Sequence, residues 1–223
     1  MPRRIAMSTL VTRCQQRADK VGDDHLTEWK SLISEVYAAD VFSVVAGTGL
    51  RYFEYVATLT TDGAAYVSEP DDHLSTIRLD YVDSSGLHYE VEPINVDEEG
   101  KLAGLPASAD RAYYYTLVDD RIYLYPTPPT GQTYEMLYIP QSPDLNDYAA
   151  DDLVDVVTPD GEACLYWGVA LLARAKASQD VALHMRKHEQ HRTRLQEWAA
   201  ERSLTQMQTR AVDTSDRCPT DRW

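Results

Sequence analysis

Three histidines in the C-terminal part of the chain are spaced as they would be on one face of a helix. His184, His188 and His191 stand four and three residues apart, which in a helix brings their imidazoles to the same side. Zinc in proteins is held by three or four convergent ligands, and imidazole is a common one. However, Met185 stands where the HExxH motif of zinc proteases carries glutamate, and the pattern specifies no carboxylate-rich partner helix. We therefore expect a solvated or interfacial histidine face and no metal site.

Carboxylates are numerous enough to raise the question of acid–base catalysis. A glycoside hydrolase needs two of them about 5–10 Å apart around a sugar. Residues 51–160 hold 22 acids, so some pair will always look suitable, and adjacent acids at turns mostly reflect turn formation. No GxSxG, P-loop or GxGxxG motif is present. The sequence therefore predicts no catalytic residue, no cofactor and no enzymatic activity. The acids considered are Glu69, Asp71, Asp72, Glu90, Glu92, Asp119, Asp120, Asp151 and Asp152.

The net charge of −15 is concentrated in the middle of the chain. Residues 1–50 hold six acids and six bases, residues 51–160 hold 22 acids and five bases, and residues 161–223 hold eight acids and ten bases. Binding to nucleic acid by counterion release needs a basic surface, so this distribution argues against specific DNA recognition. It predicts a solvated acidic surface, or an acidic wall past which a polyanion slides without sticking.

Cysteine usage and hydropathy narrow the class of protein further. Cys14, Cys164 and Cys218 are odd in number, far apart and without a CxxC pair, which argues against a disulfide framework and a cysteine-based zinc site. The longest apolar runs are five residues, well short of the roughly 20 that a membrane helix needs. The basic N-terminus has no long apolar stretch behind it, as a secretory signal would. We expect a soluble, cytosolic protein whose 43% hydrophobic residues bury a core.

Helices are predicted at both ends of the chain. Apolar residues at three- and four-residue spacing predict one helix over 7–21 and a second over 24–46, with a break at Gly22. Thr158 and Pro159 are typical of an N-cap and a first helical position, and they open a third helix that ends before Ser178. A fourth helix is predicted over 181–204, and it carries the three histidines.

Between these ends the period of the pattern changes to two, and turn signals recur. Tyr, Val and Thr are frequent there, as they are in strands. One hairpin is predicted across Asp119-Asp120, and a second joins Ile122–Tyr125 to Tyr134–Ile139 across the proline-rich turn. The candidate strands are Arg51–Thr60, Ile77–Asp83, Leu87–Pro93, Tyr113–Val118, Arg121–Pro126 and Thr133–Tyr138.

The order of these elements predicts an α+β fold. We expect an antiparallel helical bundle, with two N-terminal and two C-terminal helices, an inserted β-rich region and a flexible C-terminal tail. The predicted division is residues 1–50 with 158–204 for the bundle, 51–140 for the β-rich region, 141–157 for a connector loop and 205–223 for an extended tail.

The same order of elements and motifs resembles the head-to-tail adaptor (connector) proteins of tailed bacteriophages, especially the tail-accessory-factor type. The resemblance spans nearly all of residues 7–200 and rests on degenerate motifs in a fixed order. These motifs are Asp24 leading into Trp29 and Ile33, Tyr52-Phe53, Thr58-Leu59, Gly63, Tyr66, Glu69-Pro70-Asp71-Asp72, Ile122 through Pro128, Tyr134 through Tyr138, and the helix from Pro159 through Ala163, Tyr166, Trp167, Ala170 and Leu171.

The resemblance implies a structural virion protein in the neck, made in the host cytoplasm. Members form a ring, usually dodecameric, beneath the portal protein, extend the DNA channel and present a platform for the tail or nozzle protein. The ring lets double-stranded DNA pass without specific binding and involves no membrane. By the same resemblance, the C-terminal tail reaches the portal, and its candidate docking residues are Arg210, Arg217, Arg222 and Trp223. Arginine and aromatic side chains are favoured at interface hot spots.

Two alternatives of other classes stay open. A tail-associated glycoside hydrolase that degrades peptidoglycan would carry one carboxylate of raised pKa in a deep cleft. A tail-side binding module would place its contacts on the β-rich region and would form no ring on a portal.

Overall fold

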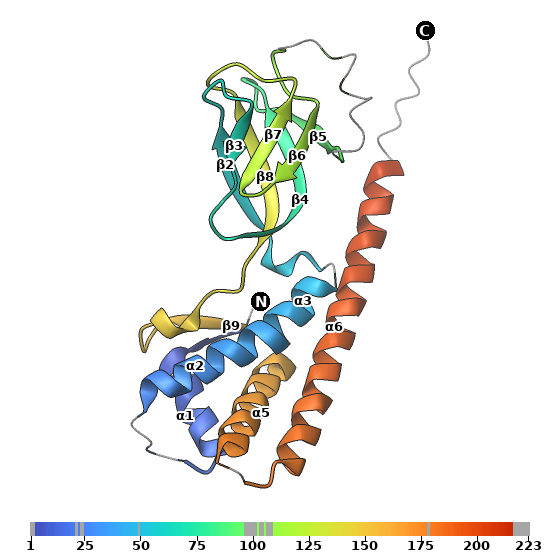
Figure 1. The fold of residues 1–223 in the computed structure, drawn as a ribbon. Helices are drawn as coiled ribbons and strands as arrows, with labels where there is room; N and C mark the ends of the chain where they lie inside the picture. Colours follow the sequence, from blue (N-terminus) through green and yellow to red (C-terminus); the bar gives the residue numbers. More distant parts are fainter. Residues whose placement is uncertain are drawn as a thin grey trace. The chain divides into compact units, whose positions relative to one another are not determined.

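In the computed structural model the chain divides into two compact units (Figure 1). We call Met1–Tyr52 with Ser142–Trp223 the helical unit, and Phe53–Gln141 the β unit. The structure describes residues 3–20, 22, 25–48, 50–95, 102, 105, 109–177 and 179–215, the last eleven of them by their backbone alone.

The helical unit is built around helix α5 (Pro159–Lys176). Helices α1 (Met7–Arg17), α2 (Leu26–Val36) and α6 (Ala182–Ser215) all pack against it. The third helix begins as the sequence predicts, because the Thr158 side chain accepts a hydrogen bond from the Gly161 N–H and Pro159 takes the first turn. The fourth helix was predicted to end at about Leu204, and α6 continues to Ser215.

The second predicted helix, over residues 24–46, is interrupted in the structure. After α2 the chain makes a π-helical turn, η1 (Tyr37–Phe42), and then α3 (Ser43–Gly47). A π-turn inserts an extra residue into the helical repeat and so rotates the apolar stripe that follows it. Tyr37, Val41 and Val45 are all buried on this segment.

A small two-stranded sheet joins the two chain segments of the helical unit, and the sequence pattern indicated neither of its strands. Strand β1 (Arg3–Ala6) pairs antiparallel with β9 (Leu153–Val157), within the segment that was predicted to be a connector loop. Val154 and Val156 are buried, while Leu153 is more than half exposed. Because the two strands are about 150 residues apart in sequence, local periodicity says nothing about their pairing.

The β unit is a nearly closed sheet of seven strands. The strand order is β2-β8-β4-β5-β6-β7-β3, and among the strands that the structure describes only the short β5–β6 pairing is parallel. The predicted hairpin across Asp119-Asp120 is confirmed as β6–β7, but the hairpin predicted to follow it is wrong, because β8 pairs with β2 and β4 instead. The strands are β2 (Tyr55–Thr60), β3 (Tyr66–Ser68), β4 (His73–Val82), β5 (His88–Pro93), β6 (Tyr114–Val118), β7 (Arg121–Tyr125) and β8 (Thr133–Pro140).

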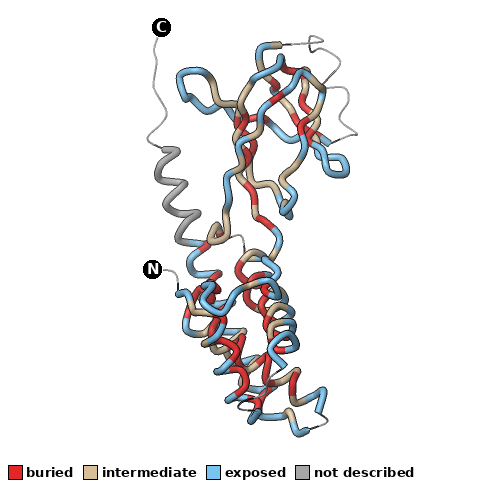
Figure 2. The backbone as a smooth tube through the Cα atoms, turned by 90° about the vertical axis from the view of Figure 1, so that its left-hand side faces the viewer, coloured by how far each residue is buried: buried red, intermediate tan, exposed pale blue. Residues whose placement is uncertain are grey.

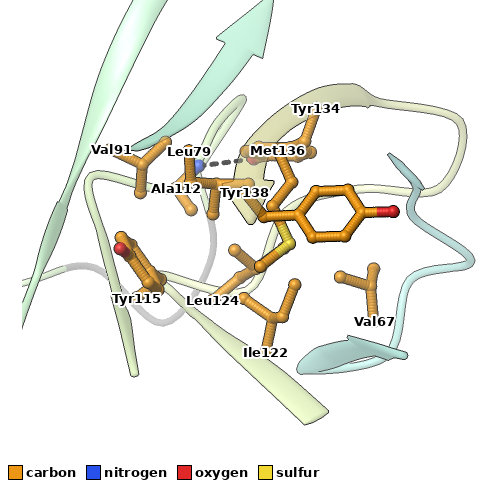
Figure 3. Packing of buried hydrophobic residues seen from close by; sticks show 10 residues of the cluster. All are labelled: Val67, Leu79, Val91, Ala112, Tyr115, Ile122, Leu124, Tyr134, Met136 and Tyr138. Carbon is orange, nitrogen blue, oxygen red and sulfur yellow. Dashed lines mark hydrogen bonds between the residues drawn. The ribbon is translucent and has the colours of Figure 1, made fainter. Parts of the chain in front are cut away.

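The β unit has a hydrophobic core of its own (Figure 3). Strand β8 alternates between buried and half-buried positions, so that Tyr134, Met136 and Tyr138 face the interior. The buried Tyr134 hydroxyl accepts a hydrogen bond of 2.9 Å from the Ala112 N–H, which satisfies both groups. The other core members are Val67, Leu79, Val91, Tyr115, Ile122 and Leu124.

The predicted fold class is therefore wrong. The protein is not a helical bundle with inserted strands, since the strands form a large sheet with its own core. The chain is 44% helical and 28% strand. Buried residues are present in the helices of one unit and the sheet of the other (Figure 2). The sequence pattern indicated strands and helices but could not show that each set buries enough apolar surface to form a compact unit.

Candidate functional site on helix α6

The three histidines of α6 each contact a different element of the helical unit. His184 Nε2 lies 3.2 Å from the Arg17 carbonyl oxygen at the end of α1. His188 Nε2 lies 3.1 Å from Asp40 Oδ2 on η1, and His191 Nδ1 lies 2.8 Å from Asp160 Oδ1 in the first turn of α5. The histidine face is thus interfacial within the fold, and it holds α6 against the rest of the unit. Among the residues that the structure describes, no group of three or more His, Cys, Asp or Glu side chains could hold a metal ion.

Asp40 is the central polar contact of this face. Besides His188, it faces Arg192, whose Nε lies 3.0 Å from Asp40 Oδ1. The carboxylate is mostly buried, with 18% of its side chain exposed. Removing one partner of such a buried pair leaves the other charge uncompensated, which is costly. Asp40 therefore fixes the middle of α6 through the π-helical turn on which it lies.

Two glycines of α5 allow its neighbours to approach closely. A Cβ on Gly168 would lie 2.6 Å from Val36 Cγ1 and 3.1 Å from both His188 Cδ2 and Nε2. A Cβ on Gly161 would collide with the Val156 carbonyl oxygen and lie 3.6 Å from Leu195 Cδ1. Both glycines are buried. The close packing of α2, α5 and α6 thus depends on the absence of side chains at these two positions.

Further along α6, apolar and aromatic contacts replace the polar ones. Leu195 and Ala199 are fully buried, and the Trp198 ring packs edge-on against Tyr52 with centroids 6.2 Å apart. The Tyr52 hydroxyl donates a hydrogen bond of 3.0 Å to Asp155 Oδ1 on β9, and burial followed by the Asp155 charge raises the pKa of Tyr52. Trp198 therefore packs on an aromatic ring that is itself held in place.

Helix α6 extends beyond α5, the helix against which it packs. His191 and Leu195 lie beside the first turn of α5. His191 contacts Asp160, and Leu195 Cδ1 would lie 3.6 Å from a Cβ on Gly161. About 20 residues of α6 follow, which span about 30 Å at 1.5 Å per residue. Arg210 lies on this part of the helix, where the backbone alone is described. Arg217, Arg222 and Trp223 lie outside the described residues.

The acids considered in the sequence have local partners, lie at turns or are exposed. Glu69 Oε2 lies 2.7 Å from His73 Nδ1, and Asp72 accepts a hydrogen bond of 2.8 Å from the Tyr138 hydroxyl. Burial and the hydrogen bond to Asp72 raise the pKa of Tyr138 to about 12. Asp119 adopts a φ of 57° at the turn between β6 and β7, with Asp120 beside it. Glu90 and Glu92 are exposed on β5, and Asp151 and Asp152 are exposed before β9.

The described cysteines are structural. Cys14 and Cys164 are fully buried free thiols, and burial raises the pKa of both, that of Cys164 to about 12. A thiol that stays protonated is a poor nucleophile and a poor metal ligand. Cys218 lies outside the described residues. No described helix is long and apolar enough to cross a membrane.

A family model described as SU10 adaptor protein matches residues 7–217. The match covers the whole of α1, α2, α5 and α6 and the whole of the β unit. No curated protein matches the sequence.

Proposed function

The chain belongs to the SU10 adaptor protein family, and from this premise we propose that it is the head-to-tail adaptor of a tailed bacteriophage. The family supports a phage structural adaptor and a virion component. In the proposed role, copies of the chain form a ring, which we take to be dodecameric, in the neck of the virion. The ring binds the portal protein on one side and the tail or nozzle protein on the other, and it acts without enzymatic activity.

The observation that carries this proposal is the extent of the family match, which runs through both units and along α6. Helix α6 adds a physical reason. It is fixed to the helical unit by three imidazole contacts, the Asp40 pair and the buried Leu195, and then continues for about five more turns. A long helix anchored along one part and free of α5 along the rest is suited to carry a docking segment toward a partner.

Docking to the portal is assigned to the C-terminal residues within this proposal. Arg210, Arg217, Arg222 and Trp223 remain the candidate contacts, since arginine and aromatic side chains dominate many interface hot spots.

Passage of DNA follows from charge in the same proposal. A ring multiplies the charge of −15 per chain, and residues 51–160 hold most of the excess acid. An acidic channel repels phosphates, so double-stranded DNA passes without being retained by specific contacts.

The test is assembly on the portal of the same virus. Purified chain and portal are mixed and examined by native mass measurement and negative-stain imaging, and a closed ring seated on the portal is expected. The paired substitutions Arg217→Glu and Arg222→Glu should weaken docking. Arg186→Glu with Lys187→Glu, the same charge change on the described part of α6, should not. A wild-type chain that stays monomeric and ignores the portal would refute the proposal.

A further inference from the structure

A basic cavity lies between α1 and α5, apart from the histidine face of α6. It has a volume of about 510 Å³. Arg3 enters from β1, and Glu162 and Tyr166 come from α5. We call it the arginine cavity and define it by Arg3, Arg13, Gln16, Arg17, Glu162 and Tyr166.

The cavity carries more positive than negative charge. Three arginines and one carboxylate line the cavity, and the carboxylate is that of Glu162, which is 5% exposed. Glu162 already accepts hydrogen bonds from Arg3 Nε, Arg13 Nη1 and the Tyr166 hydroxyl, the last at 2.5 Å. Arg17 forms no ion pair with any residue that the structure describes. A surplus of about two positive charges is therefore left in a chain whose net charge is −15.

The arginines are held in place before any ligand arrives. Arg13 Nη1 lies 2.9 Å from the Tyr166 hydroxyl, and the Arg17 guanidinium lies 4.9 Å from the centre of the Trp167 ring. Arg3 and Arg13 keep about half of their side chains exposed. Side chains that are fixed by stacking and ion pairs lose less entropy on binding, which favours a specific site over a merely charged surface.

Fixed guanidinium groups recognise carboxylates and phosphates by paired N–H···O bonds. We propose that the arginine cavity receives carboxylates from the acidic surface of a second copy of this chain. The inference rests on the proposed ring, because it assigns the contact by which one copy meets the next. A ring is built from such head-to-tail contacts, in which two different surfaces of the same protein meet.

The charge of the chain explains why a second copy is the occupant. Copies with a net charge of −15 repel one another unless acidic surface meets basic surface at their contact. Residues 51–160, with 22 acids against five bases, supply that acidic surface on every copy. Exposed carboxylates occur both in the β unit, as on β5, and in the helical unit, as at Asp147 and Asp151. DNA would compete for the same guanidinium groups, but the surrounding acids disfavour its approach.

The experiment places a photo-cross-linker, benzoylphenylalanine, at Gln16, which is exposed at the cavity and forms none of the contacts with Glu162. Heavy-isotope and light copies of the full chain are mixed, assembled with and without the portal, and irradiated. Cross-links that join heavy to light peptides rich in Asp and Glu are expected. Cross-links to the portal alone, to added DNA alone, or to nothing would overturn the inference.

A charge reversal gives the second measurement. Arg17→Glu should raise the concentration needed for half-assembly by about tenfold or more, and 0.5 M salt should weaken wild-type assembly in the same direction. Arg121→Glu is the matched control. Like Arg17, Arg121 is exposed and its guanidinium lies over an aromatic ring, 4.4 Å from the centre of the Tyr66 ring, but Arg121 lies in the β unit. Normal portal-bound rings from Arg17→Glu would overturn the inference and leave the proposed function standing. If the wild-type chain forms no rings but the heavy-to-light cross-links are still found, the proposed function is refuted and the inferred contact between copies stands.

Discussion

Gly168→Ala should destabilise the helical unit because it fills the space through which α2 and α6 approach α5. The added Cβ would lie 2.6 Å from Val36 Cγ1, where an ordinary contact is at least 3.4 Å. Val36 is 3% exposed, and a valine in a helix strongly prefers one χ1 rotamer, so its methyl group cannot swing aside. The 3.1 Å approach to His188 disturbs its contact with Asp40 as well.

The magnitude follows from two opposing effects. Alanine is favoured over glycine inside a helix by about 1 kcal/mol. Overpacking a filled core costs about 1–3 kcal/mol, and two simultaneous overlaps point to the upper end of that range. Loss of the His188 contact adds about 1 kcal/mol. The net expectation is a loss of about 3 kcal/mol from the free energy of unfolding of the helical unit.

Gly47→Ala is the matched control. Gly47 ends α3 and is exposed, and a Cβ there meets nothing within 4 Å. The same chemical change should leave stability unchanged or raise it by up to about 1 kcal/mol.

Urea unfolding followed by hydrogen exchange locates the effect. Because the chain has two compact units, a single transition need not describe it, and exchange assigns each loss to its own peptides. Faster exchange in α5 and α6, with the β unit unchanged, is expected for Gly168→Ala. If Gly168→Ala proves as stable as Gly47→Ala, the packing described for α2, α5 and α6 is wrong.

Three further predictions follow from single contacts. Asp40→Ala should cost about 1–3 kcal/mol and speed hydrogen exchange along α6, whereas Glu35→Ala on the exposed face of α2 should do neither; equal exchange in both variants would contradict the role of Asp40. Cys14 and Cys164 should resist iodoacetamide at pH 8 in the native protein and react in urea, as followed by peptide mass, and rapid native labelling would show that they are accessible. Because the folded pKa of Tyr138 is about 12 against an ordinary value near 10, its contribution to stability is intact below about pH 10 and is lost between pH 10 and 12; Tyr138→Phe should therefore reduce the alkaline loss in the β unit, and an unchanged pH profile would refute this.

The sequence predicted local elements better than their assembly. The first helix, the Thr158 cap, and the four strands β5 to β8 close to their observed bounds follow from periodicity and turn residues, which act over a few positions. Pairing depends on residues far apart, so β1 with β9 and the place of β8 between β2 and β4 could not be inferred. The π-helical turn is also invisible to a pattern that assumes one helical period.

The candidate site was predicted in part. The spacing of His184, His188 and His191 indicated one face and an interface, but not the three elements that they contact. The sequence did not indicate the arginine cavity, because Arg3 and Arg13 are far from Glu162 in the chain and meet it only in the fold. Arg17 stands on the same helical face as the apolar Leu10 and Cys14, which is only a weak indication of a charged cavity.

The most direct test of the proposed adaptor role is imaging of the purified chain mixed with the portal of its own virus. We expect a closed ring of this chain seated on the portal, with residues 205–223 protected from protease only in the complex. A chain that remains monomeric beside an unoccupied portal, with the same residues cleaved at the same rate, would contradict it.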